Sequence, residues 1–289
     1  MYVHDVGIFI GPPAPDLNDY KADIARFTAL QFRRANRFVF LTLAGACRCA
    51  GGKALETETG VYLTTENGNL SDTEAVLHQI YHRHEFPMPY NFINTMSNTA
   101  AFYVAQTLGL SGRNITFSSR QLSFERGLEL LRCDLEGGAV SAGLIGGVDE
   151  AAFSPAQFSA KFGRSAEAYA LVEGSCWLRV TGQKAGALGM IREIRSFPEG
   201  TAAAAWLEQQ SWPLPVTLAW GLLVEEEAKA FFRRFLPEAR ELDYIQRDGW
   251  FDSAAAGCVA AFLQQGDGLL VHVNFDLTGR CMVLVVEKY

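Results

Sequence analysis

Apolar segments of two kinds alternate along this chain, and this alternation limits its fold more than any other feature. Short apolar runs typical of buried strands, such as residues 6–11 and 142–148, alternate with longer segments of helical spacing, such as 37–50 and 97–110. Residues 37–50 are apolar nearly all round, which is typical of a helix buried in a layered protein. Because strands and helices alternate in both halves, the sequence predicts an α/β protein with mostly parallel sheets covered by helices.

The same reading applies to the rest of the chain. Further strands are expected at 61–65, 115–119, 167–181, 188–197, 216–221, 268–275 and 280–287, and further helices at 19–32, 71–84, 123–135, 202–210, 224–235 and 252–264. Ser71 and Glu74 have the spacing of a capping box, so the helix expected at 71–84 is predicted to begin with Ser71 as its N-cap.

Size and charge exclude several classes of function. The chain has 289 residues, enough for two domain-sized halves or one large module. Its 32 acidic residues exceed its 25 basic residues, for a net charge of −7, which disfavours binding to nucleic acid or to an anionic membrane surface. No run approaches the roughly 18 apolar residues of a membrane span, and the first residues do not resemble a signal peptide. We therefore expect a cytoplasmic protein without a membrane span.

Metal and cofactor binding are not expected. The six cysteines follow no disulfide or zinc spacing. His78 and His82 are four residues apart on a predicted helix, a geometry that zinc can use, but no third ligand is spaced to complete a site. We predict that they lie on a solvated helix face.

Four local patterns follow one another in a fixed order. Residues 98–116 lead from a helix ending in Leu-Gly-Leu-Ser-Gly into Phe-Ser-Ser-Arg-Gln-Leu-Ser at 117–123. The pattern Ala-Gly-Leu-Ile-Gly-Gly-Val-Asp-Glu follows at 142–150, and a strand containing Glu-Gly lies within 168–180. This ordered set resembles the β-ketoacyl synthases, which have the thiolase fold. The resemblance covers most of the chain and is strongest over residues 91–180.

The resemblance implies an architecture. It implies an α/β, thiolase-like fold in which one ketosynthase-like module covers residues 1–289. The two pseudo-symmetric halves, with mixed sheets and helical layers, are expected at 1–150 and 151–289. The chain is shorter than a full ketosynthase, and the segments that look abbreviated lie before Asn91 and between Gly147 and Trp220.

The resemblance also implies that the catalytic residues are replaced. A ketosynthase attacks an acyl thioester with a cysteine at a strand-to-helix turn, and two histidines assist. Here Gln121 falls at the cysteine position, while Trp220 and Trp250 fall at the histidine positions. Glutamine cannot form the acyl-enzyme, and tryptophan offers one N–H donor and no base. No catalysis by this chain alone is expected; His272 is not placed by the family's patterns, and the family's Gly-rich loop is reduced to 274–279.

A glutamine at the cysteine position resembles the chain-length factor of type II polyketide synthases, in the short form of Gram-negative aryl polyene and aromatic polyketide systems. Such a factor forms a heterodimer with a catalytic ketosynthase subunit, shapes the polyketide tunnel and meets the acyl carrier protein through the complex. The tunnel positions map onto the helix face Leu70, Thr73, Val76, Leu77 and Ile80. The strand expected to pair across the dimer interface comprises Asn114, Ile115, Thr116, Phe117, Ser118 and Ser119.

Three other functions remain open at this point. The chain could be a malonyl-carrier-protein decarboxylase, because some loading ketosynthases carry a glutamine at this position. It could be an acyl-binding module that needs no partner. It could be a diverged condensing enzyme, for which Cys133 is the nearest thiol, although the spacing places Cys133 within a helix. The helix face from Leu70 to Ile80 could also be simple packing in a subunit interface.

Overall fold

A single mixed sheet of ten strands forms the centre of the molecule. The computed structural model describes residues 1–14, 16–32 and 35–289. The strands are β1 (Tyr2–Gly11), β2 (Gly60–Thr64), β3 (Asn114–Phe117), β4 (Ala142–Asp149), β5 (Glu173–Thr181), β6 (Gly189–Phe197), β7 (Val216–Trp220), β8 (Arg240–Leu242), β9 (Leu269–Phe275) and β10 (Cys281–Lys288). They lie in the order β3-β2-β4-β5-β1-β6-β10-β9-β7-β8.

The strand order repeats in the two halves of the sheet. From the outer edge inwards it is β3-β2-β4-β5-β1 in one half and β8-β7-β9-β10-β6 in the other. In each half the outer three strands are parallel and the remaining neighbours are antiparallel. The halves join where Tyr2 and Val3 of β1 pair with β6. This repeat divides the chain between β5 and β6, at residues 182–188, whereas the sequence predicts halves that meet at residue 150.

The mostly parallel sheet predicted from the alternation is therefore wrong for the strands nearest the centre. The connection between β9 and β10, residues 276–280, is too short for the crossover that parallel neighbours need. The mixed sheet implied by the family resemblance is the one observed.

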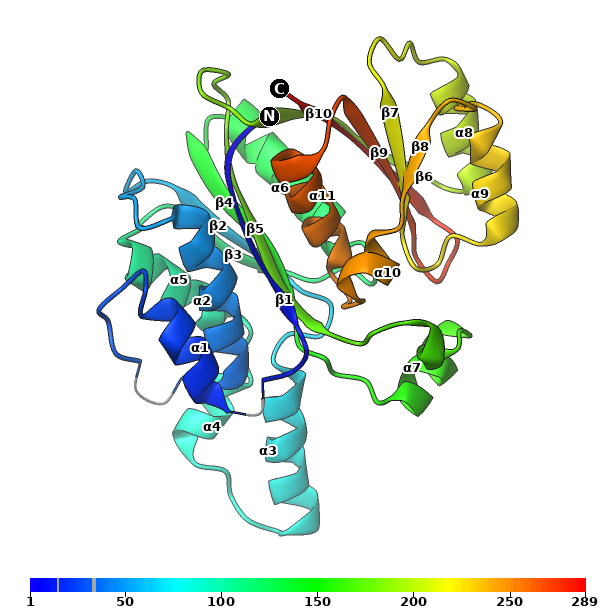
Figure 1. Cartoon of the computed structure of the whole chain (residues 1–289). Coiled ribbons are helices and arrows are strands. Elements are labelled where there is room, and N and C mark those ends of the chain that lie inside the picture. Colours follow the sequence, from blue (N-terminus) through cyan, green and yellow to red (C-terminus); the bar gives the residue numbers. More distant parts are fainter. Residues whose placement is uncertain (15, 33–34) are drawn as a thin grey trace.

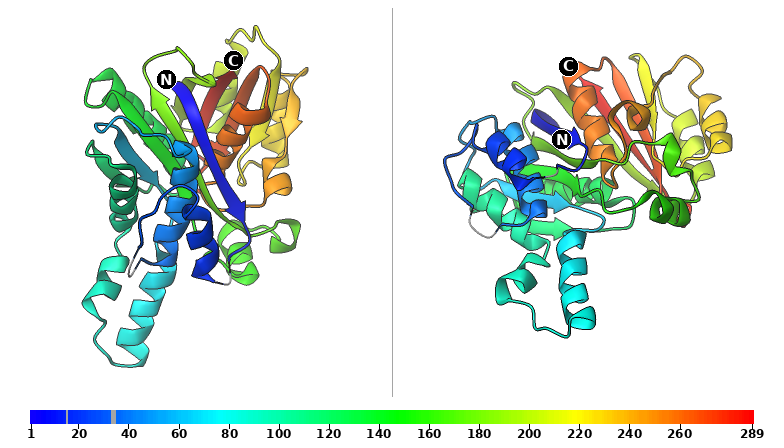
Figure 2. Two further views of the ribbon diagram at one scale, coloured as in Figure 1. Left: turned by 60° about the vertical axis from the view of Figure 1, so that its left-hand side comes forward. Right: turned by 60° about the horizontal axis from the view of Figure 1, so that its bottom comes forward.

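Helices form layers outside and between the two half-sheets (Figure 1). They are α1 (Leu17–Ile24), α2 (Arg37–Ala50), α3 (Leu70–His82), α4 (Pro89–Asn94), α5 (Asn98–Leu108), α6 (Ser123–Glu136), α7 (Pro155–Phe162), α8 (Gly200–Glu208), α9 (Glu226–Arg233), α10 (Tyr244–Asp248) and α11 (Ala254–Gln265). Helices α6 and α11 lie between the half-sheets, and α3 and α4 project from the body in each view of Figures 1 and 2. None of the helices in the described ranges is long and apolar enough to cross a membrane.

The buried helix predicted at 37–50 is confirmed as α2. Every residue of α2 except Arg37 and Arg48 is buried. The Asn36 side chain caps its first turn by accepting from the Val39 amide at 2.9 Å, and Gly51 ends it in a left-handed conformation. Apolar residues all round this segment thus fit its place between the sheet and the outer helices α1 and α5.

Two predictions about helix ends are wrong. The helix predicted over 19–32 ends at Ile24, next to the point where Arg48 of α2 holds Asp23 with two hydrogen bonds. The capping box at Ser71 does not form: α3 begins at Leu70, and the Ser71 hydroxyl donates instead to the buried Glu150 carboxylate at 2.7 Å.

The short helices α4, α7 and α10 were not expected from the apolar pattern. A complete capping box does occur at α7, where Ser154 and Gln157 bond each other's backbone amides.

Candidate functional site at the Gln121 turn

Gln121 lies in the tight turn that joins β3 to α6. The φ angles of Arg120 and Gln121 are 29° and 61°, in the left-handed region, which costs a non-glycine residue about 1–3 kcal/mol. Contacts from the second half hold this turn in place. The side-chain amide of Asn274 donates to the Gln121 carbonyl at 3.2 Å, and the Leu277 amide donates to the Gln121 side-chain oxygen at 3.4 Å.

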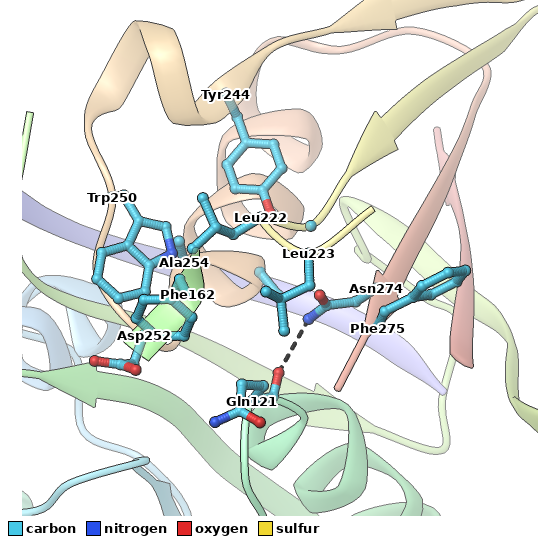
Figure 3. A pocket seen from close by; sticks show the side chains of 12 residues that line it. Gln121, Phe162, Leu222, Leu223, Tyr244, Trp250, Asp252, Ala254, Asn274 and Phe275 are labelled. Carbon is cyan, nitrogen blue, oxygen red and sulfur yellow. Dashed lines mark hydrogen bonds between the residues drawn. The ribbon is translucent and has the colours of Figure 1, made fainter. Parts of the chain in front are cut away.

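The turn faces a cavity of only about 20 Å³ (Figure 3). Such a volume holds about one water molecule. Figure 3 shows Trp250 and Phe162 on one side and Asn274 on the other, with Leu222 and Leu223 between them. The lining residues are Gln121, Phe162, Gly221, Leu222, Leu223, Tyr244, Trp250, Asp252, Ala254, Ala255, Asn274 and Phe275. The cavity cannot take an acyl thioester in this conformation.

The structure brings together two of the three residues that the resemblance placed at catalytic positions. Trp250 lines the Gln121 cavity and packs against Phe162 at 5.0 Å between ring centroids. Trp220 does not line this cavity, although Gly221, the next residue, does. The Trp220 indole N–H instead donates to the Glu241 carboxylate at 3.3 Å, on the other side of the end of β7.

Polar residues that were not predicted to take part in the site lie directly behind the turn. Glu125, in the first turn of α6, accepts a hydrogen bond from Asn274 at 2.8 Å. The carboxylate lies 3.9 Å from Nδ1 of His272, too far for a hydrogen bond, and that nitrogen has no partner among the described residues. The Tyr244 hydroxyl and Nε2 of His272 share a hydrogen bond of 3.0 Å. His272 and Asn274 are the two polar residues of the otherwise apolar strand β9, and this pattern was the signal that could have identified them.

Burial controls the ionisation of this group. It raises the pKa of Glu125 to about 7 and lowers the pKa of His272 to about 4, so the imidazole is neutral at neutral pH. Burial also raises the pKa of Asp252, which lines the cavity, to about 6. Asp252 has a side chain only 2 % exposed, and its nearest cation is Lys161 at 3.6 Å.

Replacing Glu125 with glutamine should change how stability depends on pH. A carboxyl with a raised pKa contributes stability that is present below pH 4.5 and lost as the pH rises through about 7. Glutamine mimics the protonated form, so Glu125→Gln should exceed wild type in unfolding free energy above pH 7, by at most about 3 kcal/mol, and match it near pH 4.5. Urea unfolding at both pH values measures this difference. Glu136→Gln, at the exposed end of α6, is the control; an equal difference at both pH values for Glu125→Gln would contradict the expectation.

Five of the six cysteines are buried, and the clustered histidines lie on α3. Burial raises the thiol pKa of Cys47, Cys49, Cys176, Cys258 and Cys281. Cys133 is exposed, but it lies ten residues along α6 from Ser123, about 15 Å from the turn. His78 and His82 stack on α3 at 4.7 Å, and the described part of the chain holds no group of three or more metal-ligating side chains.

An open groove runs along α3, with a volume of about 430 Å³, and we call it the α3 groove. Of the predicted tunnel positions, Leu70, Thr73 and Leu77 line it, whereas Val76 is buried and Ile80 lies outside its lining. The groove is lined by Leu70, Thr73, Glu74, Leu77, His78, Tyr81 and His82 of α3 and by Ala152, Phe153 and Gln157.

The residues predicted for a dimer interface lie at an edge of the sheet. Strand β3 is the outermost strand of its half, so one of its sides has no neighbouring strand within the described chain. Ser118 and Ser119 follow the end of β3 and bond to Glu66 and Ser123. The opposite edge, β8, is only three residues long and carries Arg240 and Glu241, features that discourage pairing.

Exposed apolar side chains concentrate in the part of the sequence that precedes β3. Of fourteen large hydrophobic residues that are exposed in the described chain, ten lie within residues 77–102. We call them the α3–α5 surface; they are Leu77, Ile80, Tyr81, Phe86, Met88, Tyr90, Phe92, Ile93, Met96 and Phe102. Exposed apolar side chains that gather in one region of a protein are typical of an interaction site.

Comparisons with known proteins agree with this architecture. No protein-family model and no curated protein matches the sequence. Among solved structures, the ishigamide ketosynthase/chain length factor is similar with a TM-score of 0.71 and 16 % identity, over 100 % of this chain and 99 % of that one. The AntDE:AntF complex of a type II PKS acyl-carrier protein with its ketosynthase gives 0.72 and 13 %, over 100 % and 99 %.

A third structure extends the likeness to another type of synthase. It is 3-oxoacyl-(acyl carrier protein) synthase III, FabH, from Pseudomonas aeruginosa PAO1, with a TM-score of 0.62, 17 % identity and coverage of 99 % and 98 %. The predicted fold class is confirmed: the chain has the thiolase-like α/β fold of the ketosynthases and chain length factors.

Proposed function

We propose that this chain is a non-catalytic chain-length factor of a type II polyketide synthase. In this proposal it pairs with an active ketosynthase and shapes the tunnel in which the polyketide grows. The observation that carries the proposal is the filled site: Gln121 occupies the strand-to-helix turn, and only about 20 Å³ remains beside it. A subunit that shapes the tunnel but catalyses no reaction does not need space for a substrate beside Gln121.

The free edge of β3 and the α3–α5 surface support a partner subunit. An edge strand offers unpaired backbone groups, and without a partner it is an aggregation hazard. Phe102 on α5 is 57 % exposed, and Phe92 on α4 is 60 % exposed. Aromatic residues of this kind are enriched at the centres of protein interfaces. In this proposal β3 pairs with the equivalent strand of the ketosynthase, and the carrier protein meets the complex rather than this chain alone.

The charges around the turn oppose the decarboxylase alternative. A malonyl group carries a carboxylate into the site, and the cavity wall already contains Asp252. Glu66 accepts a hydrogen bond from the Ser123 amide beside the turn, and the carboxyl of Glu125 is buried behind it. An additional negative charge would be repelled by the ionised carboxylates around it.

Co-expression with a catalytic ketosynthase of a type II polyketide synthase tests the proposal. The two chains should co-purify, and the complex should make a polyketide that the ketosynthase alone does not make. This chain alone should release no carbon dioxide from malonyl-carrier protein. Release of carbon dioxide that Gln121→Ala abolishes would establish the decarboxylase. Stoichiometric binding of a long acyl chain by a chain that does not co-purify with the ketosynthase would establish the acyl-binding module.

Enlarging Thr73 should shorten the product of the complex. Thr73 lines the α3 groove, and a tryptophan there would fill part of its volume of about 430 Å³. Mass spectrometry of the products of Thr73→Trp should show a chain shorter by one or more extender units. Gln79→Trp, on α3 outside the groove and half-buried like Thr73, is the control and should leave the length unchanged. An intact complex with unchanged product length in Thr73→Trp would remove the α3 groove from the tunnel.

A further inference from the structure

Three hollows adjoin the segment 150–172, which connects β4 to β5 and carries α7. They are the α3 groove, the Gln121 cavity and a cavity of about 100 Å³ beside Trp220. The segment supplies a wall of each: Phe153 lines the α3 groove, Phe162 the Gln121 cavity, and Arg164 the Trp220 cavity. One connection therefore contributes lining residues to all three hollows.

Aromatic rings fill the position between the α3 groove and the Gln121 cavity. The ring centroids of Phe153 and Phe162 lie 6.1 Å apart, and those of Trp250 lie 6.4 Å and 5.0 Å from them. The ammonium group of Lys161 lies over both phenylalanine rings, at 4.2 Å and 5.0 Å. The same ammonium group pairs with Asp252 at 3.6 Å, which holds α7 against the start of α11.

The two inner cavities are separated by very little. Gly221 and Leu222, at the end of β7, line both of them. Beyond the aromatic rings, the α3 groove would thus continue through the Gln121 cavity to the Trp220 cavity. The groove wall is largely apolar, with Leu70, Leu77 and Phe153, whereas the inner end contains the buried Asp252 carboxyl. A ligand suited to this path is a linear apolar chain that enters with its uncharged end first.

We propose that Phe153, Phe162 and Trp250 form a plug that closes an interior channel for a linear acyl chain, with the α3 groove as its mouth. The plug determines how far a chain can enter this subunit, and in the wild type the packed rings of these three residues stop the chain at the inner end of the α3 groove. The inference rests on the proposed function only for the source of the acyl chain, which would be the polyketide held by the partner.

The test is binding of cis-parinaric acid, a long-chain polyene fatty acid that becomes fluorescent in apolar surroundings, to the full-length chain without its partner. Phe162→Ala should bind it at least about tenfold more tightly than the wild type, because each additional buried methylene increases affinity about fourfold.

Phe158→Ala is the matched control. Phe158 is fully buried and packs on Phe162 and Trp250 at 5.1 Å and 4.8 Å, but it lines none of the three hollows. Its affinity should equal that of the wild type.

Circular dichroism shows whether each variant is folded. Should Phe162→Ala not fold, Phe153→Ala, at a half-buried position, must give the same gain in affinity. A folded variant with unchanged affinity, or an equal gain in Phe158→Ala, would overturn the plug. Co-purification with the ketosynthase is measured separately. Failure of the channel proposal would appear as unchanged acyl affinity, and failure of the proposed function would appear as a lack of co-purification.

Discussion

Replacing Phe102 with aspartate should weaken binding to the partner ketosynthase by at least about 100-fold. Phe102 is 57 % exposed on α5, which packs beside the β3 edge. Truncating an aromatic residue at the centre of an interface costs about 2–4 kcal/mol, and a buried aspartate adds the cost of an unpaired charge. Titration calorimetry or surface plasmon resonance with the purified ketosynthase measures the loss.

The control for this prediction is Leu277→Asp. Leu277 is 55 % exposed, close to the value for Phe102, but it lies in the turn between β9 and β10, outside the α3–α5 surface. Both variants should unfold at nearly the wild-type temperature, because substitutions of exposed side chains change stability by about 0.5 kcal/mol or less. Equal affinity of the two variants for the ketosynthase would remove α5 from the interface.

The order of local patterns was enough to predict the fold class and two of the residues that meet at the cavity. Gln121 and Trp250 are far apart in sequence, and only the family resemblance brought them together. Trp220 was assigned to the same site, but side chains at the end of a strand alternate between two faces. The face toward Gln121 is reached by Gly221 and Leu222, while Trp220 points toward Glu241. A pattern of a few residues cannot determine that choice.

The buried polar group behind the turn could not be predicted for a different reason. Glu125 lies on a helix whose charged residues, Arg126 and Glu129 among them, indicate a solvent-exposed face. Its burial depends on β9, more than 140 residues later in the chain, which brings His272 and Asn274 against α6. The central position of α6 follows from the repeat of the strand order, and that repeat is not visible as sequence similarity between the halves.

The two glycines of β4 show what the structure adds to a recognised motif. The sequence identifies Gly146 and Gly147 as part of a family pattern but gives no reason for them. In the structure a side chain at Gly146 would collide with the ring of Trp177, which lies directly opposite on β5. A side chain at Gly147 would meet Ser253 and Ala256 near the start of α11. The pair therefore lets β4 accept a tryptophan on one face and a central helix on the other.

Replacing Gly146 with alanine should destabilise the fold by several kcal/mol. The added Cβ would lie closer than 3.0 Å to three atoms of the Trp177 ring. That ring is fully buried, and its N–H donates to the Ser175 hydroxyl at 2.9 Å, so it cannot move without losing a buried hydrogen bond. Overpacking of a core costs about 1–3 kcal/mol, and a lost buried hydrogen bond adds about 1–3 kcal/mol.

Urea unfolding should show this loss of stability for Gly146→Ala. The control is Gly182→Ala, where nothing lies within 4 Å of the new Cβ, and its unfolding free energy should stay within about 0.5 kcal/mol of wild type. Equal stability of the two variants would mean that β4 and Trp177 do not pack as described. The packing at the centre of the first half would then be different as well.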